Sequence, residues 1–98
     1  MEKRIHDLVG EIIEALESNR ETISAMESCT AGFVTATIAS VDGSSAILKF
    51  SAVTYSNEYK IKMGVDPATI NKYGVYSKEV SMEMARNIAI YAASNYGI

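Results

Sequence analysis

The 98-residue sequence lacks tryptophan and has one cysteine, one proline and one histidine. A single cysteine excludes an internal disulfide, so a reducing compartment, the cytoplasm, is the expected location. The sequence has no cluster of histidines and cysteines with the spacing of a zinc site. We therefore expect neither a metal ion nor a cofactor.

The sequence also lacks clustered positive charge and long apolar runs. Its net charge is −3 and its pI is near 5.0, with scattered lysines and arginines, which disfavours a general nucleic-acid binder. Its apolar stretches are far shorter than the ~20 residues that span a bilayer, so no membrane partner is expected. The charged first residues are atypical of a signal peptide. A composition with 48% hydrophobic residues is that of one small globular domain.

Hydrophobic periodicity predicts alternating helices and strands. The expected elements are a helix over residues 2–18, a strand over 22–26, a helix over 31–40, a strand over 50–55, two short helices and a long helix over about 78–95. Such alternation is typical of a layered α/β fold. Two strands make a small sheet, and a third is expected to start at 96–98.

Several residues mark the predicted helix boundaries or the core. Gly64 closes a short helix that starts at Asn57, Asp66 and Pro67 start the next helix, and Ser77 caps the last one. The methionines are expected to fill the core and three tyrosines to pack with a polar tip. These are Met26, Met63, Met82 and Met84, and Tyr73, Tyr76 and Tyr91.

The first candidate site covers residues 27–32, where a polar strand end passes directly into a helix. In α/β folds, ligands bind at the carboxyl edge of the sheet, and a helix N-terminus can stabilise an oxyanion. The plain alternative is that Ser28 or Thr30 only caps the helix. Cys29 is a possible nucleophile, but no histidine accompanies it. Glu27 either orients a neighbouring catalytic group or faces solvent.

The second candidate site covers residues 53–60, at the end of the second predicted strand. A serine needs a base to attack an amide, and His6 lies on the polar face of the first helix, which disfavours a catalytic triad. A lysine can act as the base if burial lowers its pKa. Lys60 is the candidate, and the alternative is a solvated lysine on a short helix.

Together these segments resemble the CinA C-terminal family, which includes bacterial nicotinamide mononucleotide deamidases and the C-terminal half of two-domain competence/damage-inducible proteins. The resemblance runs in order from about residue 5 to the end of the sequence. The blocks that carry it are residues 25–32, 42–46 and 53–58, Lys60, residues 64–65 and residues 73–77.

This resemblance implies an amidohydrolase in which Ser28 is the nucleophile, Lys60 the general base and Tyr55 an assisting residue. The implied reaction hydrolyses the carboxamide of nicotinamide mononucleotide to nicotinate mononucleotide and ammonia. The candidate substrate contacts are Thr30, Gly32, Ser44, Ser45 and Asn57. The serines form either a phosphate-cradling turn or a plain loop, and Asn57 is either a ligand or the N-cap of its helix.

Two departures from the family pattern are visible. The family usually has two glycines where this chain has Ala31 and Gly32. The family also continues with a strand, a Thr-Gly-x-x-Gly turn and further elements. We therefore expect residues 1–98 to be the N-terminal portion of a single layered α/β/α domain. The alternatives to an amidase are an inactive binding or regulatory module and a fragment that is stable only as a homo-oligomer.

Overall fold

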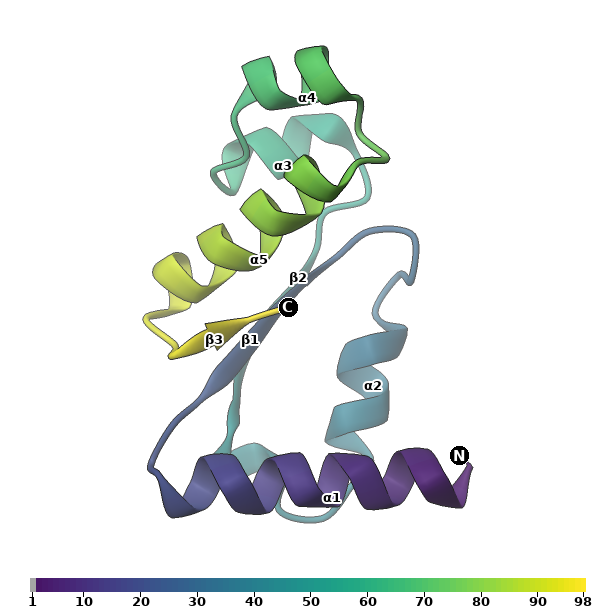
Figure 1. Ribbon diagram of the computed structural model, residues 1–98, viewed down its shortest axis with the longest axis vertical. Helices are drawn as coiled ribbons and strands as arrows, with labels where there is room; N and C mark the ends of the chain where they lie inside the picture. The colour runs from purple at the N-terminus through teal and green to yellow at the C-terminus, as the bar shows by residue number, and fades with distance from the viewer. Residues whose placement is uncertain (1) are drawn as a thin grey trace.

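The computed structural model describes residues 2–98 and has an α/β architecture (Figure 1). The elements in chain order are α1 (Lys3–Ser18), β1 (Ile23–Glu27), α2 (Phe33–Ala39), the 3-10 turn η1 (Ser44–Ala46), β2 (Leu48–Val53), α3 (Asn57–Lys62), α4 (Pro67–Tyr73), α5 (Lys78–Ala92) and β3 (Tyr96–Gly97). Helix α1 crosses one end of the molecule, and α3 and α4 gather at the other.

The three strands form one parallel sheet in the order β2-β1-β3. The start of β1 pairs with both neighbours, since Ile23 lies opposite Leu48 of β2 and Tyr96 of β3. The backbone N–H of Met26 donates to the carbonyl of Ile98 at 2.7 Å, which extends the β3 pairing. The expectation of a two-stranded sheet is therefore wrong, because the last residues already pair with β1 as a short third strand, at the position where a third strand was expected to start. Because all strands point the same way, the segments that follow β1 and β2 meet at one edge of the sheet.

Helices cover both faces of the sheet, as the layered prediction requires. Side chains alternate between faces along a strand, so Met26 and Glu27 of β1 point to opposite sides. Met26 packs into a buried cluster dominated by α5, whereas Glu27 bonds to the start of α2. The α5-side cluster contains Met26, Val65, Val80, Met84 and Ile88.

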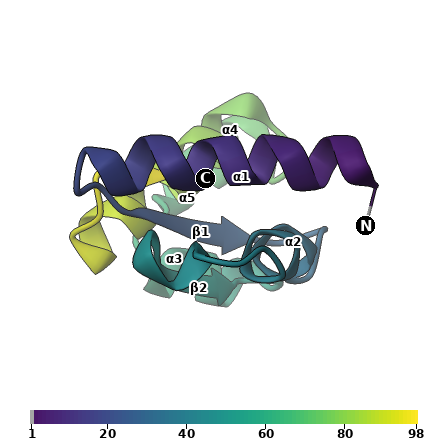
Figure 2. The same ribbon diagram turned by 90° about the horizontal axis from the view of Figure 1, so that it is seen from below.

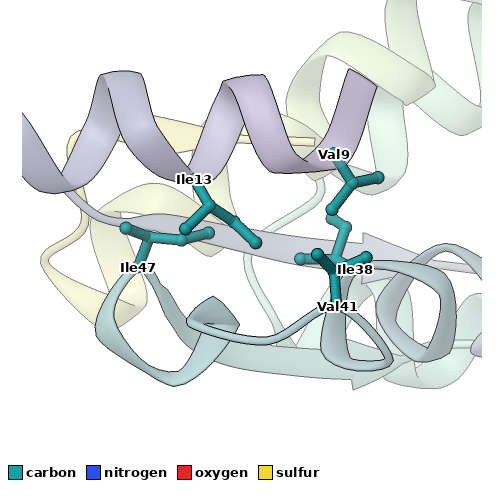
Figure 3. Close-up of a cluster of buried hydrophobic side chains, with 5 residues drawn as sticks. All are labelled: Val9, Ile13, Ile38, Val41 and Ile47. Atoms are coloured by element: carbon teal, nitrogen blue, oxygen red, sulfur yellow. The ribbon is translucent and has the colours of Figure 1, made fainter. Parts of the chain in front are cut away.

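A second apolar cluster joins α1 to the end of the sheet where the strands begin (Figure 3). Its members are Val9, Ile13, Ile38, Val41 and Ile47. In the view from below, α1 spans the width of the molecule (Figure 2). Only part of its predicted apolar face is buried, since Ile5, Leu8 and Ile12 remain exposed. Among residues 2–98, no helix is both long and apolar enough to cross a membrane.

Several element boundaries differ from the sequence predictions. Helix α2 starts at Phe33, because Ala31 and Gly32 have left-handed backbone conformations, with φ of 52° and 101°. Helix α5 ends at Ala92, because Ala93 is also left-handed, with φ of 53°. Strand β2 covers residues 48–53, two residues earlier than predicted.

The side-chain predictions were partly wrong. Met26 and Met84 are buried as predicted and Met63 packs beside them, but Met82 is exposed on α5. Tyr73 and Tyr76 are exposed rather than packed. Tyr91 is exposed as well, although its ring lies 5.5 Å from that of Phe50.

Strand β3 approaches α5 so closely that only glycine fits at position 97. A Cβ atom there would lie 1.8 Å from the backbone oxygen of Ala85. We expect Gly97→Ala to lower the free energy of unfolding by about 2 kcal/mol or more, because β3 must leave its place beside α5. Urea unfolding measures this change.

Gly10→Ala is the matched control, since a Cβ at Gly10 in α1 meets no atom within 4 Å. Alanine stabilises a helix interior, so this variant should gain about 0.5–1 kcal/mol. Equal effects of the two substitutions would contradict the close approach of β3 to α5.

Candidate active site

The structure brings Ser28 and Lys60 together at the carboxyl edge of the sheet. Ser28 directly follows β1, and Lys60 lies in α3, which follows β2. The Lys60 Nζ donates hydrogen bonds to Ser28 Oγ at 2.9 Å, to the Thr54 carbonyl at 2.6 Å and to the Tyr55 carbonyl at 3.3 Å. Lys60 is only 2% exposed, so the interpretation of it as a solvated lysine is wrong.

Within residues 2–98, no carboxylate forms an ion pair with Lys60. The ion pairs found among residues 2–98 are Lys62 with Glu58 and His6 with Asp7, both exposed. Burial lowers the pKa of Lys60 from its usual 10.5, and the neighbouring Cys29 opposes this shift only partly. The amine is therefore more readily deprotonated than a surface lysine.

The three partners of Lys60 Nζ match an ammonium, which can donate to all of them, and they also accommodate a neutral amine. A neutral amine has two N–H donors and one lone pair. The Thr54 and Tyr55 carbonyls take the two donors, and the lone pair can then accept the proton of Ser28 Oγ. This geometry meets the distance requirement for a base that activates a serine nucleophile.

Glu27 holds the loop that carries Ser28. Its carboxylate accepts five hydrogen bonds, from Thr30 Oγ1 at 2.7 Å, Gly32 N at 3.1 Å, Val34 N at 2.9 Å, Thr35 N at 2.8 Å and Thr35 Oγ1. Glu27 is 5% exposed, so it does not face solvent, and its carboxylate bonds to residues 30–35 rather than to Lys60 or Tyr55. Burial raises the pKa of Glu27, but the hydrogen bonds, with those from Thr35 and Thr30 foremost, outweigh burial and lower it to about 2.

Backbone N–H groups at the N-terminus of α2 thus donate to Glu27. This residue lies five positions before Gly32, the N-cap of the helix. The interpretation that Ser28 or Thr30 caps this helix is wrong, because the Glu27 carboxylate occupies that position. Ser28 Oγ is therefore available to Lys60.

Two cavities meet at the Ser28–Lys60 pair. The larger, of about 450 Å³, lies between residues 25–30 and the start of α5. The smaller, of about 120 Å³, extends towards Tyr55 and Asn57. Both are lined by Ser28, Cys29, Lys60, Val75 and Tyr76.

Three of the other candidate site residues lie at these cavities, with different roles. Tyr55 is 74% exposed and lines the smaller cavity. Asn57 lines the same cavity but does not cap α3, because Ser56 Oγ accepts from the Tyr59 N–H at 3.3 Å and is the cap. Thr30 lines the larger cavity, while its hydroxyl donates to Glu27.

The remaining candidates are not brought to the cavities. The N–H of Gly32 donates to Glu27, and Gly32 lines neither cavity. Ser44 and Ser45 lie in η1, just before β2, at the opposite edge of the sheet from Ser28. Ser44 Oγ donates to the Ala39 carbonyl at 3.2 Å, which favours the plain-loop interpretation over a phosphate cradle at this site.

His6 lies on α1 beside Asp7 and lines neither of the cavities that contain Ser28. The described part of the chain contains no group of three or more His, Cys, Asp or Glu side chains that could hold a metal ion. The sequence interpretation missed the part that Val75 and Tyr76 have in both cavities. The sequence signal that could have indicated this role is a large aromatic residue, Tyr76, in the short connection between two predicted helices.

The sequence profile of the CinA C-terminal domain matches residues 5–98. The chain belongs to the CinA C-terminal domain family. A putative competence-damage inducible protein of Alkaliphilus oremlandii is 43% identical over 89% of this chain and 21% of its own length. A CinA-like protein of Fervidobacterium nodosum is 40% identical over 99% of this chain and 23% of its own length. The chain thus spans about a fifth of these curated relatives.

Solved structures of the CinA superfamily share the fold. The competence/damage inducible protein from Agrobacterium tumefaciens has a TM-score of 0.92 at 29% identity, covering 97% of this chain and 58% of that one. The competence damage-inducible protein A of Klebsiella pneumoniae has a TM-score of 0.87 at 26% identity, covering 93% and 57%. The α/β fold class predicted from the sequence is confirmed.

The bonds of Glu27 predict a pH-dependent contribution to stability. Glu27→Gln should lower the free energy of unfolding by about 2–3 kcal/mol at pH 7, because an amide cannot accept all five hydrogen bonds. The folded pKa of about 2 lies below the ordinary 4.5, so this contribution is complete above pH 4.5 and is lost as pH falls towards 2. Urea unfolding of both proteins over this pH range measures it.

Glu58→Gln is the control, since the exposed Glu58–Lys62 pair should contribute less than about 1 kcal/mol. The role of the carboxylate would be contradicted if the difference in free energy of unfolding between wild type and Glu27→Gln stayed the same from pH 7 to pH 2.

Proposed function

We propose that this chain carries the nucleophile and base of an amidohydrolase that converts nicotinamide mononucleotide to nicotinate mononucleotide and ammonia. The observation that carries the proposal is the 2.9 Å contact between Ser28 Oγ and a buried lysine that has no ion-pair partner among residues 2–98. The substrate is inferred from the resemblance of the sequence to the deamidases of the family.

In the first step, neutral Lys60 accepts the proton of Ser28 Oγ while the oxygen attacks the carboxamide carbon. The carbonyl oxygen becomes an oxyanion and needs hydrogen-bond donors. The backbone N–H groups of Cys29 and Thr30 are candidates, because neither donates a hydrogen bond within residues 2–98. They lie immediately beyond the nucleophile.

In the second step, the Lys60 ammonium returns its proton to the departing nitrogen, which leaves as ammonia. The carbon is now an ester of Ser28. Water then attacks this ester, again with neutral Lys60 as the base, and the Ser28 oxygen leaves with a proton from Lys60. The products are free enzyme and a carboxylic acid, which gives its proton to ammonia or solvent and becomes the carboxylate; none of these steps needs a metal ion.

A binding module without turnover is the second candidate, and the backbone of Ala31 favours it. Ala31 has φ of 52° in the loop just beyond Ser28, a conformation that favours glycine. The added methyl group stands where the family usually has none. Binding of the nucleotide without ammonia release would support this candidate over the amidase.

We predict that Ser28→Ala and Lys60→Met each reduce turnover by about 10³-fold or more, and that the double variant is little worse than either. The effects do not add, because Ser28 is unreactive without its base and Lys60 has nothing to activate without Ser28. Ammonia release from nicotinamide mononucleotide over a pH series measures turnover. Activity should rise with pH through a limb well below the free-lysine pKa of ~10.4.

Lys62→Met is the matched control, because Lys62 is an exposed lysine of the same helix, paired with Glu58 at 3.3 Å. It should leave turnover near the wild-type level. Retention of activity by Ser28→Ala together with its loss in Cys29→Ala would show that the thiol, not the hydroxyl, is the nucleophile.

A further inference from the structure

Two tyrosines beside the Ser28–Lys60 pair have rings that are exposed to solvent rather than packed in the core. Tyr76 is 96% exposed and Tyr55 is 74% exposed, the two highest values among the six tyrosines of the chain. Both line the small cavity that contains Ser28 and Lys60, and Tyr76 also lines the larger one. Two aromatic rings are thus presented to solvent at the place where a substrate would meet the nucleophile.

The backbone that carries Tyr76 is held on both sides. Before it, Gly74 ends α4 with φ of 83°. After it, Ser77 Oγ donates to the Gly74 carbonyl at 2.7 Å and accepts from the Val80 N–H at 3.2 Å. The ring is therefore free while its attachment point is fixed. Ordering a tyrosine side chain on binding costs little, because it has only two rotatable side-chain angles.

The two tyrosines reach the cavity from different elements. Tyr55 follows β2, whereas Tyr76 precedes α5. Their rings can therefore contact a flat ligand from separate sides. Aromatic faces attract other aromatic rings and also cations, and the ring of a pyridine nucleotide is both aromatic and positively charged.

We propose that Tyr76 is a specificity-determining residue that stacks on the planar, cationic ring bearing the amide, with Tyr55 as the second wall. This inference rests on the proposed function and deepens it. It assigns recognition of the ring to the loop between α4 and α5, which no part of the sequence interpretation connected with the substrate. Aliphatic amides would lack this contact.

The test compares nicotinamide mononucleotide with ribose 5-phosphate, which has the same sugar phosphate but lacks the aromatic ring. Calorimetric titration of the Ser28→Ala protein, which cannot turn over the amide, gives the Kd of nicotinamide mononucleotide and of ribose 5-phosphate. Adding Tyr76→Ala should weaken binding of the first by about 5–30-fold and leave the second unchanged. Tyr76→Phe should stay within about twofold, because stacking needs the ring and not the hydroxyl.

Tyr73→Ala is the matched control, since Tyr73 is an exposed tyrosine of α4 that lines neither cavity. It should change neither Kd. Unchanged nucleotide binding in Tyr76→Ala, or equal weakening for both ligands, would overturn the stacking role while leaving the amidase proposal intact. Absence of nucleotide binding before Tyr76 is changed would overturn the proposed substrate, and the inference with it.

Discussion

Lys60 is buried at 2% exposure with its ammonium nitrogen against two backbone carbonyls and one serine hydroxyl. Burying a charge without a counter-ion is unfavourable, and a lysine in that position responds by losing its proton more readily. The rest of the site depends on this constraint. A neutral amine beside Ser28 makes an otherwise unreactive hydroxyl a nucleophile.

The parallel sheet produces this contact. The loop after β1 supplies Ser28, and the segment after β2 supplies both carbonyls and then the helix that carries Lys60. Side chains alternate between the two faces of the sheet along β1, and this alternation sets the direction of the carboxylate next to Ser28. Glu27, the residue before Ser28, points to the α2 face, where five donors occupy its carboxylate. The carboxylate nearest in sequence to the nucleophile is thus committed to holding the loop and does not pair with Lys60.

Local signals in the sequence predicted much of this arrangement. Asp66 with Pro67 and Ser77 cap the helices that they were expected to cap, and Gly64 follows α3 with φ of 110°. Placing two strand ends at one edge of a sheet brought the segments of Ser28 and Lys60 near each other, but the pairing of these two residues as nucleophile and base came from the resemblance to the family.

Other features depend on tertiary contacts that no local pattern encodes. The capping of α2 by Glu27 requires a carboxylate to reach residues 30–35 across a left-handed turn. The exposure of Tyr76 depends on where the loop between α4 and α5 lies relative to β1. Ser44 and Ser45 have the composition of a phosphate-binding turn, but the direction of β2 places them at the far edge of the sheet. Composition alone does not distinguish one edge of a sheet from the other.

The most direct test of this account is the pKa of Lys60 itself, measured by NMR titration of its side-chain carbon and nitrogen resonances. Loss of a signal in Lys60→Met assigns the resonance. The midpoint should lie below the ordinary 10.5, because burial disfavours the ammonium form. A midpoint at or above 10.5 would mean that the buried amine stays protonated at neutral pH, and Lys60 could not then be the base for Ser28.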